Sequence, residues 1–235
     1  MADVNIAASR LCQTCDLGIV SYGEALHLQN SLANARITDK IPDTIIFLQH
    51  FPTITIGISS KESDIIAPEG LLTSEGISVS HTDRGGGVTY HGPGQVVVYP
   101  ILNLKAIGKG IHQYMHDLEE VMIRTLATFS IPAHIDPQYP GVWVEQDKIG
   151  ALGIRVSHWV TKHGIALNVN TNPKHFSYII PCGIVDRKVT SMSQLLGHAI
   201  SLRDVTSCLL EQFIGVFDLE VRQESVGELK QYYDG

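Results

Sequence analysis

Short β-rich runs dominate the pattern of hydrophobic and polar positions along the chain. The runs are Leu11–Val20, Thr44–His50, Thr53–Gly57, Ile77–His81, Val88–His91, Gln95–Leu102, Val142–Glu145, Lys148–Val156 and Gly164–Asn170. Gly92-Pro93-Gly94 predicts a turn between Val88–His91 and Gln95–Leu102, and Gln146-Asp147 is short enough to join the strands on either side of it as a hairpin. Because few helical segments separate the runs, the pattern predicts an α+β fold with a mixed, mainly antiparallel sheet and helices packed on it.

Helical signals are fewer. Ser21, with a glutamate three positions later, forms a capping-box pattern that predicts a helix ending near Arg36. Ile111–Phe129 carries apolar residues at helical spacing and predicts the clearest long helix. Ser201, followed three positions later by an aspartate, predicts a last helix that ends near Phe217.

The chain reads as one catalytic domain. Its 235 residues are 44% hydrophobic and 17% charged, which allows a sizeable core. No repeat or linker-like stretch divides residues 1–235, so we expect a core of about 11–217 and a loosely held acidic tail of 218–235. Apolar runs are strand-sized and the first residues show no targeting pattern, which predicts a cytoplasmic protein without a membrane segment.

Charge is unevenly distributed. Seventeen basic and 24 acidic residues give a net charge of −7, which disfavours a nucleic-acid partner. The segment from Lys148 to Lys188, however, contains six basic residues and one acidic residue, Asp186. This basic segment favours an acidic protein partner, unless its charges are scattered over the folded surface.

Four cysteines are present: Cys12, Cys15, Cys182 and Cys208. Cys12 and Cys15 have half of a zinc-site spacing, but no second pair follows, and in a strand they point to opposite faces. We therefore expect ordinary reduced thiols there. The chain also lacks G-x-S-x-G, P-loop and H-E-x-x-H patterns, and nothing completes a metal site with His112 and His116.

Two segments stand out as candidates for chemistry. In Arg84–Gln95, three successive glycines precede Thr89, Tyr90 and His91, so this run forms either the wall of a tunnel for a long chain or a flexible hairpin. In Ile179–Ile184, Cys182 lies between a proline and a glycine. That context suits a thiol exposed at a sheet edge, although a lone cysteine is more often a small buried hydrophobe.

Taken together, these segments resemble the lipoyl(octanoyl) transferase family. The resemblance runs in order through Arg84–Gln95, Lys148–Arg155, Trp159–Asn170 and Pro181–Ile184, and covers roughly Leu11 to Leu196. It implies the fold shared by biotin and lipoate ligases. It also implies octanoyl (or lipoyl) transfer from acyl carrier protein to a lysine of lipoyl domains, namely those of 2-oxoacid dehydrogenases and of the glycine cleavage H protein.

The resemblance also assigns residues. It implies Cys182 as the nucleophile that carries the acyl group and Lys148 as the lysine that lowers its pKa. The implied substrate-binding residues are Arg84, Gly85, Gly86, Gly87, Val88, Thr89, Tyr90 and His91, then Ala151, Leu152 and Gly153, then Gly164, Ile165 and Ala166. The family commonly has a polar or charged residue where this chain has Gly87, a departure that we expect to change loop stiffness rather than chemistry.

An acyl-enzyme route needs no ATP and no metal, because donor and intermediate are both thioesters. A free thiol is only about 3% thiolate at pH 7, so an ammonium group near Cys182 would activate it. Lys148 and Cys182 are 34 positions apart, and only the fold can bring them together. The alternatives are an ATP-dependent lipoate or biotin ligase and a non-catalytic module that binds these proteins; we expect a monomeric transferase.

Overall fold

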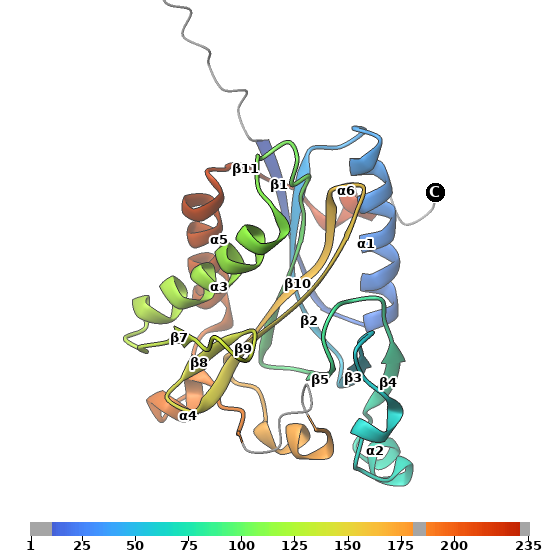
Figure 1. The fold of residues 1–235 in the computed structure, drawn as a ribbon, viewed down its shortest axis with the longest axis vertical. Coiled ribbons are helices and arrows are strands. Elements are labelled where there is room, and N and C mark those ends of the chain that lie inside the picture. The colour runs from blue at the N-terminus through green and yellow to red at the C-terminus, as the bar shows by residue number, and fades with distance from the viewer. Residues whose placement is uncertain (1–10, 181–186, 231–235) are drawn as a thin grey trace, which may run out of the picture.

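Residues 11–180 and 187–230, the ones that the computed structural model describes, form two sheets covered by helices (Figure 1). The large sheet has the spatial order β11 (Glu220–Gln223), β1 (Leu11–Val20), β2 (Asp43–His50), β6 (Gln95–Ile101), β10 (Val160–Asn168), β9 (Asp147–Ser157), β8 (Val142–Val144) and β7 (His134–Ile135). In this sheet β1 pairs in parallel with β11 and β2, and every other pairing is antiparallel. The predicted mixed, mainly antiparallel sheet is thus confirmed.

A small sheet lies beside the large one. It has the order β4 (Ser78–His81), β3 (Thr53–Ile56) and β5 (Val88–His91). Its inner face has a core of its own, built from Ile54, Val88, Tyr90 and Phe176 with neighbouring apolar residues.

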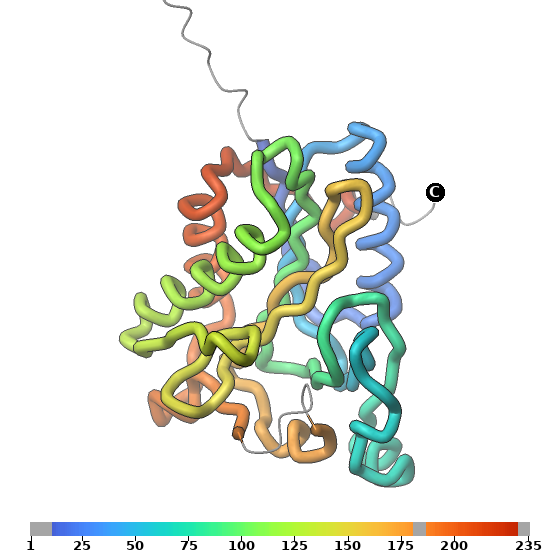
Figure 2. Tube along the Cα trace, viewed as in Figure 1, coloured from blue at the N-terminus to red at the C-terminus, as the bar shows by residue number. Residues whose placement is uncertain are grey.

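Helices cover both faces of the large sheet (Figures 1 and 2). On one face, α3 (Ile111–Thr128) and α5 (Leu202–Phe217) pack together, and on the other lies α1 (Tyr22–Ile37). Shorter helical segments are η1 (Glu62–Asp64), α2 (Glu69–Ser74), η2 (Pro173–Tyr178), α4 (Met192–Leu196) and α6 (Val226–Lys230). The predicted capping box is present: the Ser21 hydroxyl accepts from the Glu24 N–H, and the Glu24 carboxylate accepts from the Ser21 N–H.

The alternation of β1 separates its two cysteines. Cys12 is buried in the core beneath α3 and α5, whereas Cys15 is buried in the core beneath α1. Burial raises the pKa of Cys15 to about 11 and raises that of Cys12 further. Both are inert structural thiols, as the sequence predicted.

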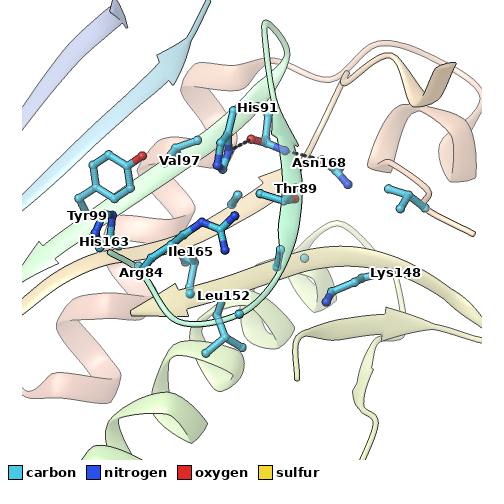
Figure 3. A pocket seen from close by; sticks show the side chains of 18 of the residues that line it. Arg84, Thr89, His91, Val97, Tyr99, Lys148, Leu152, His163, Ile165 and Asn168 are labelled. Atoms are coloured by element: carbon cyan, nitrogen blue, oxygen red, sulfur yellow. Dashed lines mark hydrogen bonds between the residues drawn. The ribbon is translucent and has the colours of Figure 1, made fainter. Parts of the chain in front are cut away.

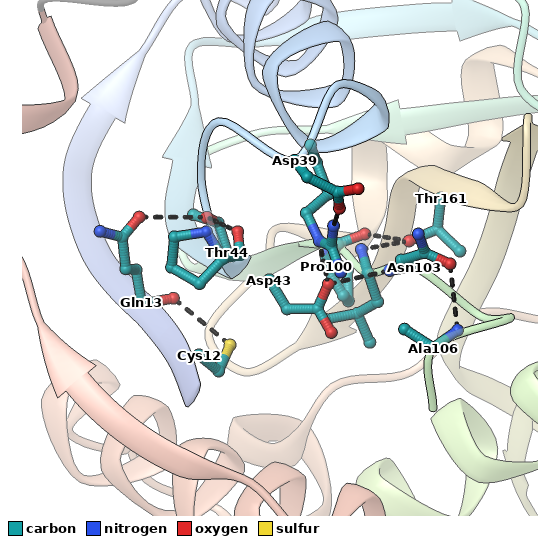
Figure 4. Close-up of polar contacts among 12 residues, drawn as sticks. Cys12, Gln13, Asp39, Asp43, Thr44, Pro100, Asn103, Ala106 and Thr161 are labelled. Atoms are coloured by element: carbon teal, nitrogen blue, oxygen red, sulfur yellow. Dashed lines mark hydrogen bonds and ion pairs between the residues drawn. The ribbon is translucent and has the colours of Figure 1, made fainter. Parts of the chain in front are cut away.

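A buried carboxylate ties α1 to the sheet (Figure 4). Asp43 opens β2 and accepts hydrogen bonds from the Arg36 Nε, at 2.7 Å, and from the backbone N–H of Asn103, at 2.9 Å. Because Arg36 lies in the last turn of α1 and Asn103 follows β6, one side chain fixes three elements together.

Three expectations need correction. The tail is not loosely held where it is described, because β11 pairs with β1 and Leu229 of α6 is buried. The strand expected from Gly164 begins at Val160, after a tight turn at His158 and Trp159 with positive φ angles; the turn residues are not the usual Asn-Gly, so the pattern hid it. The turn between β8 and β9 lies at Glu145 and Gln146, one residue earlier than expected.

The basic segment is also less free than its composition suggested. Lys162 pairs with Asp83, Lys174 with Glu75, and Arg187 with Asp136, so acids from outside the segment compensate half of its cations. Among the described residues, no helix combines the length and the apolarity needed to cross a membrane.

Candidate active site

A cavity lies between the large sheet on one side and strand β5 with the loop before it on the other (Figure 3). Its walls come from β6, β9 and β10 on one side and from Arg84, Thr89 and His91 on the other. Apolar side chains such as Val97, Leu152 and Ile165 provide much of the lining. Sequence segments far apart in the chain therefore build one pocket.

The strand register gives this cavity a direction. Asn168 of β10 pairs with Gln95 of β6, and Gly164 of β10 pairs with Gly153 of β9. Lys148, at the start of β9, lies at one end of the cavity, while Tyr99 and His163 lie at the opposite end (Figure 3). Lys148, Gly86 and Leu152 also line an adjoining surface groove, so the Lys148 end is the mouth.

The glycine run is a rigid wall. The Gly85 N–H donates to the Ile154 carbonyl of β9 at 2.9 Å, and Gly86 has a positive φ of 86°. A Cβ on Gly153 would stand only 2.9 Å from the Gly85 oxygen, so this close approach requires a glycine. The run thus lines a cavity, and β5 pairs with β3 rather than folding back as a hairpin on β6; that the cavity holds a long chain stays a prediction.

Arg84 belongs to the same wall and lines the cavity with its buried side chain. The guanidinium is buried and donates to the Thr55 carbonyl, at 2.9 Å, and to the Thr55 hydroxyl, at 2.8 Å. It also donates to the Gly85 carbonyl at 3.1 Å. These bonds fix the loop to β3 of the small sheet.

Strand β5 places its residues on alternate sides. Thr89 and His91 point into the cavity (Figure 3), whereas Val88 and Tyr90 are buried in the core of the small sheet. The Tyr90 hydroxyl lies 2.7 Å from Nδ1 of His175. Tyr90 therefore supports the wall from behind.

Three buried histidines gather at and near the closed end, and their hydrogen bonds define their tautomers. Gln95 donates its amide N–H groups to Asn168 and to the Tyr90 carbonyl, so its oxygen accepts from Nδ1–H of His91 at 2.8 Å. His50 donates from Nδ1 to the Val20 carbonyl and accepts at Nε2 from the Tyr99 hydroxyl. His163 donates from Nε2 to Asp83 at 2.8 Å.

All three imidazoles are neutral at pH 7. Burial lowers the pKa of His50 and of His163 to about 4, the latter despite its bond to Asp83. Burial, helped by His50 and Arg84, lowers the pKa of His91 well below its usual value. Asp83 is less buried; although burial opposes its charge, hydrogen bonds from His163 and Lys162 lower its pKa to about 2. Neutral rings thus line this part of the cavity, and the charged Arg84 beside them is satisfied by Thr55 and Gly85, which leaves a lining that suits an apolar ligand.

Lys148 is held at the mouth. Its ammonium donates to the Pro140 carbonyl at 2.8 Å and lies 5.4 Å from the centre of the Trp143 ring. Its backbone pairs with the strand-like segment around Val189. Cys182, the expected nucleophile, lies outside the described residues.

The structure places most of the expected site residues in one wall or another. The expected residues that line the cavity are Lys148, Arg84, Gly86, Thr89, His91, Ala151, Leu152, Gly153, Gly164, Ile165 and Ala166. The Gly85 N–H bonds the glycine run to β9, and Gly87 lines the adjoining surface groove. The sequence interpretation missed Tyr22, Val97, Tyr99 and Phe176; for Val97 and Tyr99 the available signal was that they alternate with Gln95 on one face of β6.

Known proteins resemble this chain in both sequence and fold. The model of the lipoyl protein ligase A/B catalytic domain family matches residues 21–214. An octanoyltransferase of Caldicellulosiruptor saccharolyticus is 46% identical over 219 residues, which cover 92% of this chain and 93% of the relative. One from Bacteroides fragilis is 44% identical over 202 residues, covering 82% and 91%.

Solved structures show the same fold at low identity. A lipoate-protein ligase A bound with ATP has a TM-score of 0.76 at 15% identity and covers 96% of this chain and 92% of its own. The Thermoplasma acidophilum bipartite lipoate protein ligase, solved in work on that ligase and its E2 lipoyl domain, gives 0.74 at 15%, with 96% and 89% covered. The biotin protein ligase of Aquifex aeolicus with biotin and ATP gives 0.54 at 13%, covering 89% and 70%.

The chain therefore belongs to the lipoyl protein ligase A/B catalytic domain family. The similar solved structures are ligases and the similar sequences are octanoyltransferases, so the fold alone leaves the reaction open. The curated relatives at 39–46% identity are octanoyltransferases, and this chain is accordingly an acyltransferase that transfers octanoyl groups in protein lipoylation.

Proposed function

We propose that the chain takes an octanoyl group from acyl carrier protein and gives it to a lysine of a lipoyl domain, with a thioester on Cys182 as intermediate. Lys148 is the acid and base of this reaction. The observation that carries the proposal is the position of Lys148 at the mouth of a cavity that is lined largely by apolar side chains and by neutral histidines. Such a cavity suits an acyl chain with its reactive end at the mouth.

The described residues on both sides of Cys182 support its role. The Ile180 N–H donates to the Asp64 carbonyl, and Cys182 follows two residues later, within about 7 Å of chain length. On the other side, the Lys148 N–H donates to the Lys188 carbonyl, and the Thr190 N–H donates to the Lys148 carbonyl, each at 2.9 Å. Lys188 and Thr190, which follow Cys182 in the chain, are thus tied to the backbone of Lys148.

The first step is a thioester exchange. The Cys182 thiolate attacks the octanoyl carbonyl carbon, the bond from that carbon to the carrier's sulfur breaks, and the departing thiolate takes a proton from the Lys148 ammonium. Octanoyl-Cys182, a free carrier thiol and neutral Lys148 result. Because one thioester replaces another, this step needs no ATP.

The second step forms an amide. Neutral Lys148 takes a proton from the acceptor lysine's ammonium, and the resulting amine attacks the octanoyl carbonyl of Cys182. The carbon–sulfur bond breaks, and the second amine proton leaves with the Cys182 sulfur as a thiol. That thiol loses its proton to solvent beside the recharged Lys148, so the starting pair is restored.

The proposed partners are inferred from the names of related proteins. Octanoyl transfer in the curated relatives supports an octanoyl donor. The work on the archaeal ligase and its E2 lipoyl domain supports lipoyl domains as acceptors. Lipoyl domains of 2-oxoacid dehydrogenases and of the glycine cleavage H protein are the acceptors proposed. The proposed enzyme acts in the cytoplasm as a monomer without metal or nucleotide.

Mass spectrometry of the intact enzyme tests the nucleophile. After incubation with octanoyl acyl carrier protein and no nucleotide, we expect one octanoyl adduct on the parent and on Cys208→Ser, and none on Cys182→Ser. An adduct on Cys182→Ser would overturn the assignment. If instead only free octanoate with ATP gave acylated lipoyl domain, accompanied by pyrophosphate exchange, the chain would be a ligase.

Alkylation tests Lys148 separately. A nearby ammonium favours the thiolate, so Lys148→Ala raises the pH at which Cys182 reacts with iodoacetamide. The buried thiols Cys12 and Cys15 serve as unreactive internal references in the folded protein. An unchanged pH profile in Lys148→Ala would remove the proposed electrostatic role.

A further inference from the structure

Glu119 is a buried carboxylate beneath the loop that receives Lys148. It lies on α3 with only 8% of its surface exposed, and its Oε1 accepts the backbone N–H of Gly141 at 2.9 Å. Its neighbour Glu120 is more exposed and pairs with Arg124 on the same helix. A buried carboxylate requires a specific partner, and here that partner is a single peptide group.

The same peptide group holds Lys148 on its other side. The N–H of Gly141 and the carbonyl of Pro140 belong to one peptide bond, and that carbonyl accepts from the Lys148 ammonium at 2.8 Å. Glu119, the peptide and Lys148 therefore form a chain of two charge-assisted hydrogen bonds. A carboxylate that accepts from the N–H polarises the peptide and makes its carbonyl a stronger acceptor for a cation.

The packing around this peptide leaves it little freedom. Gly141 has a φ of 124°, and a Cβ there would stand 2.6 Å from Cε of Lys148 and 2.6 Å from the Gly150 carbonyl oxygen. The Trp143 ring, in the adjoining strand β8, faces the ammonium. The peptide is thus pressed against the lysine stem, so a shift of the peptide would move the ammonium.

We infer that Glu119 is a positioning residue for Lys148, which it holds through the Pro140–Gly141 peptide; this inference rests on the proposed function, in which Lys148 is the acid and base. Glu119 touches neither substrate nor nucleophile in this assignment. Its contribution is to hold the ammonium at the mouth of the cavity.

The ionisation of Glu119 agrees with this geometry. Burial raises the pKa of Glu119, while the Gly141 N–H and the charges of His116 and Lys148 lower it again. A neutral amide at this position would keep the hydrogen bond to Gly141 and lose the charge interaction with Lys148, so it isolates the contribution of the hydrogen bond.

Steady-state kinetics of octanoyl transfer tests the inference with three variants. Glu119→Leu removes the acceptor and lowers kcat by about tenfold, with KM unchanged, as expected for the loss of a hydrogen bond to a charged group. Glu119→Gln keeps an acceptor oxygen and stays within about threefold of the parent. The matched control Glu120→Leu, one position along the helix, leaves kcat unchanged. Circular dichroism and thermal unfolding verify that each variant folds.

The outcomes separate the inference from the function on which it rests. If Glu119→Leu keeps the parental kcat, loses activity only through KM, or performs no worse than Glu119→Gln, the inference is overturned. If Lys148→Ala itself retains full activity, the proposed function fails instead. If the inference and the proposed function are both correct, the double variant Glu119→Leu/Lys148→Ala is no slower than Lys148→Ala alone, because Glu119 acts only through the lysine. A further loss in the double variant would contradict the inference.

Discussion

The two ends of the cavity differ in electrostatic character: buried histidines gather at one end, and a lysine ammonium and an ion pair lie at the other. At the closed end, His50, His91 and His163 are buried and lose their charge. At the mouth, the Lys148 ammonium donates to the Pro140 carbonyl, and Arg187 forms an ion pair with Asp136. The difference follows the expected substrate: an acyl chain is best held by apolar and uncharged groups, while the reacting thioester needs an ammonium nearby. Burial and pairing therefore divide one cavity into a binding end and a reacting end.

Each end depends on neighbours that are remote in sequence. The closed end is stabilised by hydrogen bonds that specify each tautomer, such as the Tyr99 hydroxyl donating to His50. The mouth is stabilised by rings and carbonyls: the Arg187 guanidinium lies 5.3 Å from the Tyr139 ring centre and 5.1 Å from that of Trp143, beside Lys148. Cation–π contacts favour the charged state, whereas apolar burial disfavours it.

The largest predicted effect is an acid sensitivity that originates at the closed end. As the pH falls from about 6.5 towards 4, the unfolded chain protonates these histidines and the folded chain does not, so the free energy of unfolding decreases. Each histidine that is protonated in the unfolded chain and neutral in the folded chain contributes about 1.4 kcal/mol per pH unit. The slope is therefore roughly 4 kcal/mol per unit in the pH range where this holds for all three. Urea unfolding between about pH 7 and pH 5 measures this slope.

A variant assigns that slope to the cluster. His50→Gln cannot take up the proton, so its stability decreases less steeply with acid than that of the parent. Asp83 does not mask the effect: its lowered pKa of about 2 gives stability that is present above its ordinary pKa and is lost only as the pH falls towards 2. His116→Gln is the control, because His116 is exposed on α3, outside the cluster. Equal slopes in the parent and in His50→Gln would remove this account of the closed end.

Local signals in the sequence predicted most of the strands and the long helices, but not the far end of the cavity. The alternation in β5 and the glycine run at Arg84 identified one wall, and the motifs on β9 and β10 identified another. The neutral state of His163 could not be predicted, because it depends on burial beneath α1, whose Gln29 receives the His163 backbone N–H. Tyr22 was missed for the same reason: only the packing of α1 on the sheet brings it to the cavity.

The tail and the loop beneath Lys148 show the same limit. Residues 220–223 looked like an acidic extension, yet they pair with β1, a partner some 200 positions away. The Pro140–Gly141 peptide joins Glu119 and Lys148, and no spacing rule links those three positions. Hydrophobic period predicts elements, whereas such contacts depend on long-range packing.

The next smaller predicted effect is the loss of unfolding free energy when a glycine at either end of the cavity is replaced by alanine. A Cβ on Gly164, near the closed end, would lie 2.2 Å from the backbone oxygen of Val98, which cannot move without disturbing β6. A Cβ on Gly150, near the mouth, would first meet the flexible end of Met122 at 2.7 Å. We expect Gly164→Ala to lower the free energy of unfolding by about 3 kcal/mol and Gly150→Ala by about 1 kcal/mol, measured by urea unfolding. Similar losses in both variants would show that the two ends are equally rigid.

The smallest effect isolates burial from hydrogen bonding. Two tyrosine–histidine bonds have the same 2.7 Å length: Tyr99 to His50 is buried, and Tyr90 to His175 is partly buried. Tyr99→Phe leaves the His50 Nε2 without a partner where water does not reach, so it costs roughly 1–2 kcal/mol of unfolding free energy. Tyr90→Phe costs less, because water can replace the lost hydroxyl. Urea unfolding at neutral pH measures both, and equal costs would mean that the closed end is not the dry environment on which its neutral histidines depend.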